Sequence, residues 1–162
     1  MPRLTGLDDI HKAAQHMLEF PKLMSQATTD AADLIDDVIQ EDFDAGVNPY
    51  GEPWAPLRPA TLAKGRTPPP LTDEGLLRAV NVEPLQGAGL KIEFDEDYAV
   101  YHQTGTSRMA QRLILPEESR GLPERWNDAV VEAMNNAVNG WAQKLGWRAS
   151  GYGNGGRLTG RE

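Results

Sequence analysis

The sequence predicts an α+β fold, in which a small antiparallel β-sheet packs with N-terminal and C-terminal α-helices. Apolar residues recur at helical spacing within residues 5–44 and again within residues 123–145. Between these regions, short alternating apolar stretches are separated by glycine-rich and acidic turns. A long proline-rich loop, residues 46–70, joins the first helical region to the predicted strands.

Length and composition predict one globular domain. The chain has 162 residues, of which 40% are hydrophobic and 25% charged, and a chain of this size and composition buries a real core. We expect a single domain over residues 1–149. Residues 150–162 are glycine-rich and too poor in apolar residues to order themselves, so they predict a flexible tail.

Two helices are expected before the proline-rich loop. Residues 5–20 predict the first, with Thr5 as its cap, and Pro21 is expected to break or kink the chain after it. Residues 22–44 predict a longer helix that stops at Gly46. Its apolar stripe is typical of a helix that packs on a core, although a stripe of this kind also suits an interface.

The loop over residues 48–57 (NPYGEPWAPL) holds its shape through its prolines, since each proline restricts its own backbone and that of the residue before it. Trp54 is therefore presented either to the core or to a partner, and the simpler interpretation is a connecting loop pinned by its tryptophan. Residues 61–67, which include Lys64 and Arg66, are expected to be exposed. Pro68, Pro69 and Pro70 predict a rigid extended spacer.

The remaining elements follow in order. Thr72 can cap a short helix that reaches Val80. Residues 82–85, 90–94 and 98–101 predict three strands of an antiparallel meander, and residues 113–115 a further extended piece. Residues 123–145 predict the C-terminal helix, on which Trp126 and Trp141 share one apolar stripe.

Several classes of function are disfavoured by composition. No apolar run approaches the roughly 18–20 residues of a membrane span, and the first nine residues lack the apolar core of a secretory signal. We therefore expect that the protein is made in the cytoplasm and does not associate with a membrane. The chain has no cysteine and three histidines, so we expect no disulfide, no metal site and no cofactor.

Charge is distributed unevenly around a net value of −8. Residues 1–50 carry −7, residues 51–101 carry −3 and residues 102–162 carry +2. Net negative charge opposes wrapping of nucleic acid, which leaves DNA only as a passing genome in a channel. The acidic end of one subunit could instead meet the basic end of a neighbour in a head-to-tail ring, although a solvated acidic helix face is the commoner explanation of such a pattern.

Three ordered motifs resemble the virion-morphogenesis (tail-completion) proteins of Mu-like and related tailed phages. These motifs are residues 48–57, residues 71–78 (LTDEGLLR) and residues 97–105 (DYAVYHQTG). They match the family patterns D/N-P-x-G-x-P-W-x-P-L, L-x-x-x-G-x-L and Y-A-x-x-H-Q-x-G in order and rough spacing. Two departures occur: Glu74 stands where the family usually has Ser or Thr, and residues 109–116 lack the proline-arginine-proline frame and the aromatic of the family's last element.

The resemblance implies a non-enzymatic structural protein of the head–tail neck in the virion. It would complete the tail tube and join it to the head connector by forming a homo-oligomeric ring, a hexamer in preference to a dodecamer. Its partners would be the tail tube protein, the head connector or stopper protein, and further copies of itself. The candidate assembly residues are Trp54, Lys64, Arg66, Arg108 and Arg112, although isolated arginines are more often simply solvated.

The alternative is a small binding protein or enzyme with its site around His102 and the proline-rich loop. A histidine beside Asp97 or Glu96 could act as a general base. However, no serine or cysteine nucleophile motif accompanies it, and residues 101–105 (YHQTG) more simply predict a strand end that turns through Gly105. A DNA-binding module is the least favoured class because of the net negative charge.

Overall fold

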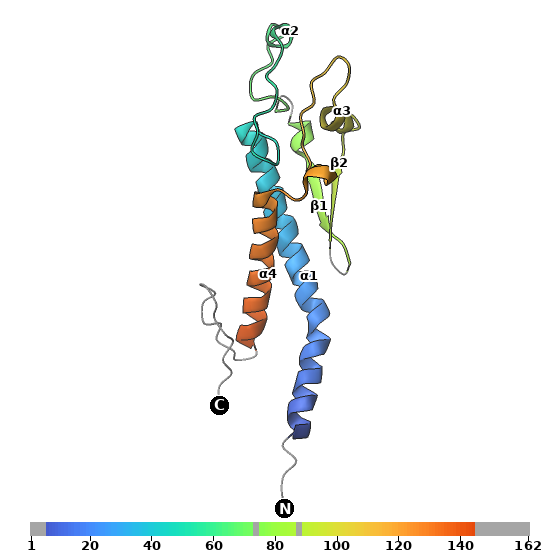
Figure 1. The fold of residues 1–162 in the computed structure, drawn as a ribbon, viewed down its shortest axis with the longest axis vertical. Coiled ribbons are helices and arrows are strands. Elements are labelled where there is room, and N and C mark those ends of the chain that lie inside the picture. Colours follow the sequence, from blue (N-terminus) through green and yellow to red (C-terminus); the bar gives the residue numbers. More distant parts are fainter. Residues whose placement is uncertain (1–5, 73–74, 87–88, 145–162) are drawn as a thin grey trace, which may run out of the picture.

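The protein is built around two long helices. The structure, a computed structural model, describes residues 6–72, 75–86 and 89–144. Helix α1 (Gly6–Ala45) forms the spine of an elongated molecule, and helix α4 (Glu124–Lys144) runs antiparallel beside its middle part (Figure 1). The C-terminal helix is therefore confirmed. No helix in the described ranges is both long and apolar enough to span a membrane.

Alanines line much of the contact between these two helices. Ala27, Ala31 and Ala32 of α1 are buried, as are Ala129, Ala133 and Ala137 of α4. Small side chains allow two helices to approach closely, which compensates for the limited apolar area that each alanine buries. The contact ends in a smaller cluster where Leu23 packs against Ala137 with the help of Met134 and Trp141.

Pro21 was expected to break or kink the chain; the expected break into two helices is wrong, because α1 continues through this residue. A proline inside a helix removes one backbone hydrogen bond and crowds the preceding turn, yet the neighbouring turns can keep their own bonds. Pro21 is exposed, so water can serve the carbonyl group that has lost its donor. Directly after Pro21, Leu23 and Ala27 pack against α4, and this packing stabilises the continuous helix.

The main core lies at the end of α1 that is far from its N-terminus. Ile35, Ile39 and Phe43 of α1 are almost completely buried there. They pack against residues from four later segments: the proline-rich loop, the 3₁₀ turn before β1, the segment after α3 and the start of α4. These residues are Trp54, Leu77, Ile114 and Trp126. One helix thus organises segments from the whole length of the chain.

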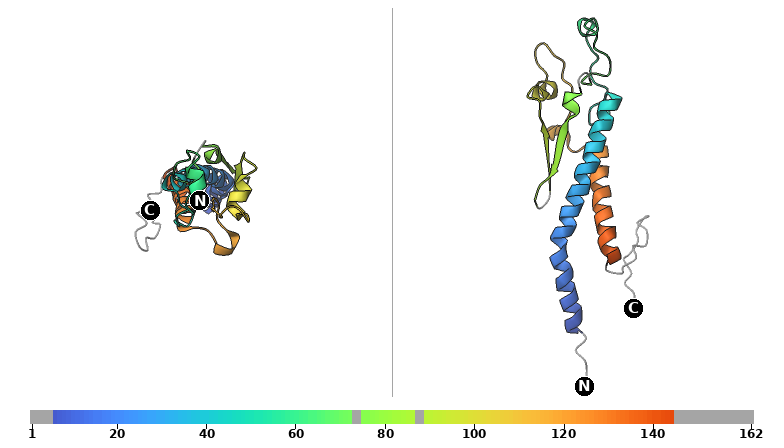
Figure 2. Two further views of the ribbon diagram at one scale, coloured as in Figure 1. Left: turned by 90° about the horizontal axis from the view of Figure 1, so that it is seen from above. Right: turned by 180° about the vertical axis from the view of Figure 1, so that it is seen from behind.

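A two-stranded antiparallel sheet covers one side of α1, which confirms the α+β class (Figure 2). Strands β1 (Val80–Pro84) and β2 (Leu90–Phe94) pair with Val82 opposite Ile92. Their alternate residues are half-buried and pack on the core, while Lys91 and Glu93 face outward and form an ion pair.

The third predicted strand is wrong, since residues 99–104 form helix α3 (Ala99–Thr104). A four-residue apolar stretch does not distinguish a strand from a turn of helix. The helix places Ala99 and Gln103, four residues apart, on the same face. Ala99 is buried in the core and Gln103 reaches the extended segment at residues 114–115, so tertiary contacts favour the helix.

The remaining connections are short turns. The helix expected from Thr72 to Val80 is wrong in extent: a 3₁₀ turn covers Leu76–Arg78, and β1 begins at Val80. Helix α2 (Pro59–Leu62) is one turn within the proline-rich loop. Residues 62–68 are exposed as expected, whereas Thr61 and Pro69 are half-buried and Pro70 is buried. A second 3₁₀ turn, Glu118–Arg120, precedes α4. The expected tail, residues 150–162, lies outside the described residues.

Candidate functional site

Trp54 connects the proline-rich loop to the core. Its side chain is 7% exposed and meets Phe43 edge-on, with ring centroids 5.3 Å apart. Its indole Nε1–H donates to the carbonyl of Leu113 at 2.8 Å. Of the two roles considered for Trp54, the structure places it in the core, as the tryptophan that pins a connecting loop.

Gln103 takes the place of a neighbouring strand. Its Oε1 accepts hydrogen bonds from the backbone N–H groups of Ile114 and Leu115, at 2.8 and 3.0 Å. Its Nε2 donates to the carbonyl of Leu115 at 2.9 Å. Residues 113–115 are extended and largely buried, so one amide side chain satisfies backbone groups that would otherwise lack partners.

Arg112 is an internal clamp. The residue is 8% exposed, and its guanidinium donates from Nε to the carbonyl of Ala55 and from Nη2 to the carbonyl of Pro56, at 2.8 and 3.1 Å. Its backbone N–H donates to the carbonyl of His102. Arg112 therefore joins α3 to the proline-rich loop and holds a positive charge in a fixed position.

A second group of side-chain interactions fixes the start of the proline-rich loop. The Asn48 Oδ1 accepts from the backbone N–H groups of Tyr50 and Glu52, which is an Asx-type turn. The Tyr50 hydroxyl lies 3.0 Å from both the N–H of Glu117 and the carbonyl of Gly121. Arg120 stacks over the Tyr50 ring and pairs with Glu52, which lowers the pKa of the Glu52 carboxyl.

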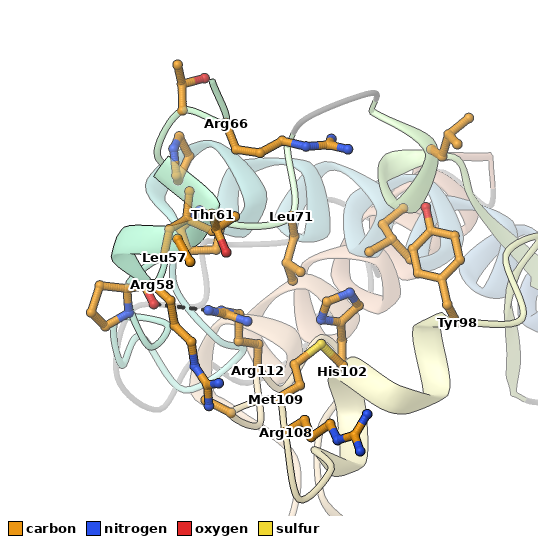
Figure 3. Close-up of a pocket in the computed structure, with 18 of the residues that line it drawn as sticks. Leu57, Arg58, Thr61, Arg66, Leu71, Tyr98, His102, Arg108, Met109 and Arg112 are labelled. Atoms are coloured by element: carbon orange, nitrogen blue, oxygen red, sulfur yellow. Dashed lines mark hydrogen bonds between the residues drawn. The ribbon is translucent and has the colours of Figure 1, made fainter. Parts of the chain in front are cut away.

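A pocket of about 740 Å³ lies between the proline-rich loop and α3 (Figure 3). Apolar side chains from the proline-rich loop and from the segments that follow the loop and α3 line much of it, among them Leu57, Leu71, Leu77 and Met109. His102 projects into it from α3, near Leu71 and Met109 (Figure 3). The pocket therefore brings together residues more than 50 positions apart in the sequence, such as Leu57 and Met109.

Positive charge dominates the pocket. Its lining includes four arginines and no aspartate or glutamate among the described residues: Arg58, Arg66, Arg108 and Arg112. Burial lowers the pKa of the His102 imidazole, and the charge of Arg112 lowers it further. Burial also lowers the pKa of Arg112, with a smaller contribution from the charge of Arg58. These cations therefore lie close enough to disfavour one another.

The ring of His102 has no carboxylate beside it in the described part of the pocket. Its buried Nδ1 has no hydrogen-bond partner among the described residues, and no described carboxylate lines the pocket to orient the ring. Within the described ranges, no group of three or more His, Asp or Glu side chains is arranged to hold a metal ion. The imidazole is instead a neutral group beside arginines.

The predicted assembly residues occupy different places. Arg66, Arg108 and Arg112 line the pocket, Lys64 is exposed on the adjoining loop and outside the lining, and Trp54 is buried. The sequence analysis missed Arg58 and the structural role of Gln103, because the sequence around each residue does not reveal which distant segment its side chain contacts. Comparison of the chain with protein-family models, curated proteins and solved structures found no match, so the family resemblance rests on the motifs alone.

Proposed function

We propose that this protein is a structural component of the head–tail neck of a tailed phage, which completes the tail tube and joins it to the head connector by ring assembly. The observation that supports this most is the joining of two motif segments, residues 48–57 and 97–105, through the segment at residues 111–115. The side chains of Trp54, Gln103 and Arg112 each donate a hydrogen bond to a backbone carbonyl in one of the other two of these three segments. Side chains that are used in this way hold the fold together, which suits a structural protein better than an enzyme.

The elongated helix pair supports self-association. Helix α1 extends beyond the end of α4 toward its N-terminus (Figure 1). Alongside α4, Leu18 and Phe20 of α1 are 77% and 57% exposed. On α4, Val131 and Val138 are also exposed and lie two turns apart on one face. We propose that a second copy of this chain covers these apolar side chains, since such groups gain stability when removed from water.

Charge complementarity favours a head-to-tail arrangement of the copies. Several exposed acidic residues lie along α1, among them Asp33, Asp37 and Asp44. Arg58 and Arg108, which have no ion-pair partner among the described residues, lie together at the pocket. Contact between unlike surfaces of neighbouring copies is heterologous and closes into a ring when the rotation permits. A hexamer would match a sixfold tail tube, with a dodecamer facing the head connector as the alternative.

Two measurements test the proposal together. The mass of the purified protein is measured in solution, and particles produced without the protein are examined by electron microscopy. A ring, or a monomer whose absence leaves heads and tails unjoined, would support the neck assignment. A stable monomer whose loss leaves intact, infectious particles would refute it.

The pocket favours a second candidate function, that of a small binding protein. Under this alternative, Arg58, Arg108 and His102 would contact a ligand, and particle assembly would not depend on them. Replacement of His102 by glutamine separates the two candidates, provided that the variant folds. A neck protein would still assemble normally, whereas a binding protein would lose affinity for its ligand.

A further inference from the structure

We propose that the pocket between the proline-rich loop and α3 binds an organic anion. A carboxylate or phosphate group would be held by Arg58 and Arg108, and the apolar part of the ligand would lie against Leu71, Leu77 and Met109. Such a site would exist whether or not the protein belongs to a phage neck, because it depends only on residues of this chain.

The pairing of the arginines distinguishes the pocket from the rest of the surface. Outside the pocket, Arg78, Arg120 and Arg125 each form an ion pair with a carboxylate of the chain. Inside it, the guanidinium groups of Arg58 and Arg108 have no hydrogen-bond or ion-pair partner among the described residues. Among the described residues, these two arginines therefore have no carboxylate of the chain as a partner. Unpaired guanidinium groups favour carboxylate and phosphate, which match their planar donors.

Two further groups make the pocket suited to an anion. The guanidinium of Arg112 is fixed by two carbonyl groups of the proline-rich loop, so its charge needs no reorganisation on binding. Burial, and then the charge of Arg112, lower the pKa of His102, and a bound anion would offset the second of these causes. Figure 3 shows His102 and Arg112 on the same side of the pocket, with Met109 between His102 and Arg108.

The size and the apolar lining limit the kind of ligand. A volume of about 740 Å³ lies within the range of small-molecule sites and also accepts a short peptide segment. Leu77 is buried beneath the pocket, whereas Leu71 and Met109 are half-buried. Apolar surface of this kind adds affinity for a ligand with an apolar body, which inorganic phosphate lacks. We therefore expect an amphipathic anion to bind more tightly than inorganic phosphate.

The probe for the first experiment is anilinonaphthalenesulfonate, an anion with an apolar body whose fluorescence rises on binding. We expect saturable binding to the full-length protein and competition by inorganic phosphate. The double variant R58Q/R108Q should bind the probe about 10-fold more weakly or worse, since both guanidinium groups that would hold the anion are removed. Ala110→Trp, which fills the pocket from an exposed lining position, should also weaken binding.

The matched control is K22Q/K144Q, which removes the same net charge from two exposed lysines outside the pocket. This control should bind the probe as the unmodified protein does, and circular dichroism should show that every variant is folded. Equal affinity of R58Q/R108Q and K22Q/K144Q would overturn the proposal. So would equal affinity for a neutral apolar dye and for the anionic probe.

The magnetic resonance signal of the His102 imidazole tests whether the anion binds in this pocket. The chain has three histidines, so the imidazole resonance of His102 can be assigned by replacing His11 and His16. Addition of inorganic phosphate at constant ionic strength and pH should shift the His102 resonance in a saturable manner and leave that of His16 in place. No response from His102 in a folded protein would overturn the proposed site.

The anionic group can come from a free small molecule or from an acidic side chain of a second copy. The probe titration is therefore repeated at protein concentrations below and above the point of self-association. Weaker probe binding by the associated protein would identify the second copy as the source of the anion. Unchanged binding would identify a free ligand, and both results support an anion site.

Discussion

Trp54 donates its indole N–H to the backbone carbonyl of Leu113 at 2.8 Å, across a separation of 59 residues. This bond ties the proline-rich loop to the extended segment that follows α3, inside the main core. Replacement of Trp54 by phenylalanine should cost roughly 2–4 kcal/mol of unfolding free energy, because it leaves the Leu113 carbonyl without a donor and opens a small cavity. Denaturant unfolding measures this cost. Leu62→Ala, at a residue that is 44% exposed, is the control and should change stability little.

Gln103 offers a graded test of a side chain that replaces a strand. Gln103→Ala should cost roughly 2–4 kcal/mol, because the backbone N–H groups of Ile114 and Leu115 lose their acceptor. Gln103→Glu keeps the acceptor for both N–H groups but sets a second oxygen against the Leu115 carbonyl, so it should destabilise the fold while leaving those two hydrogen bonds in place. Hydrogen exchange at residues 114 and 115 should accelerate in the alanine variant. Gln143→Ala, at an exposed position of α4, should leave both measurements unchanged.

Gly105 is required for two separable reasons. Its φ of 71° disfavours other residues, and an added Cβ would lie 3.1 Å from the backbone nitrogen of Gln111. Gly51 has a similar φ of 80° but open space around an added Cβ. Gly51→Ala should therefore cost only the roughly 1–2 kcal/mol of the backbone conformation, while Gly105→Ala should cost roughly 1–3 kcal/mol more. Thermal unfolding compares the two, and equal losses would show that the close approach to Gln111 costs nothing.

Asp42 should make stability fall as the pH rises through the mildly acidic range. Burial raises its pKa from 3.8 to about 6, despite its ion pair with Arg125. The folded state therefore binds a proton more tightly than the unfolded state, and ionisation of Asp42 destabilises the fold between these two values. The contribution lost from about pH 4 to about pH 6.5 is roughly 2 kcal/mol.

The change that tests this titration is Asp42→Asn, which keeps an oxygen for Arg125 and removes the ionisation. Unfolding free energies measured across the same pH range should show a flatter profile than those of the unmodified protein. Glu41→Gln removes the other, exposed carboxylate that pairs with Arg125 and should keep most of the slope. An identical slope in the Asp42 variant would show that another group titrates.

Phe20 tests the proposed contact between copies. Phe20→Asp places a charge on an apolar position that is 57% exposed in the single chain, so it should disturb association more than folding. We expect the association constant to fall about 10-fold or more. Sedimentation of the two proteins over a range of concentrations measures the change. Leu62→Asp, at a similarly exposed apolar residue on α2, is the control, and equal effects of both changes would argue against this surface.

Much of the fold follows from local patterns. The periodicity of residues 124–144 and the alternation of residues 90–94 predict the elements that form there, because each pattern repeats long enough to specify one period. The break at Pro21 and the strand at residues 98–101 were wrong predictions. In both cases contacts with distant residues outweighed a local preference: Leu23 packs on α4, and Ala99 packs in the main core.

The candidate site was only partly accessible to sequence reasoning. Arg66, Arg108 and Arg112 were identified as basic residues of interest, yet their convergence on one pocket depends on how the proline-rich loop folds over α3. Arg112 illustrates the difficulty, since its guanidinium is clamped by carbonyl groups 56 and 57 residues earlier in the chain. A pattern in one segment does not reveal the backbone groups of another.

The sequence by itself determined the α+β class, the two helical ends, the hairpin and the stiffness of the proline-rich loop, because these depend on periodicity and on the backbone restrictions of proline and glycine. Tertiary structure alone decided the unbroken course of α1, the helical state of residues 99–104 and the convergence of four arginines on one pocket. These features arise from burial and from hydrogen bonds between residues far apart in the chain. Their free energies exceed local propensities, which amount to roughly 1 kcal/mol or less per ordinary residue.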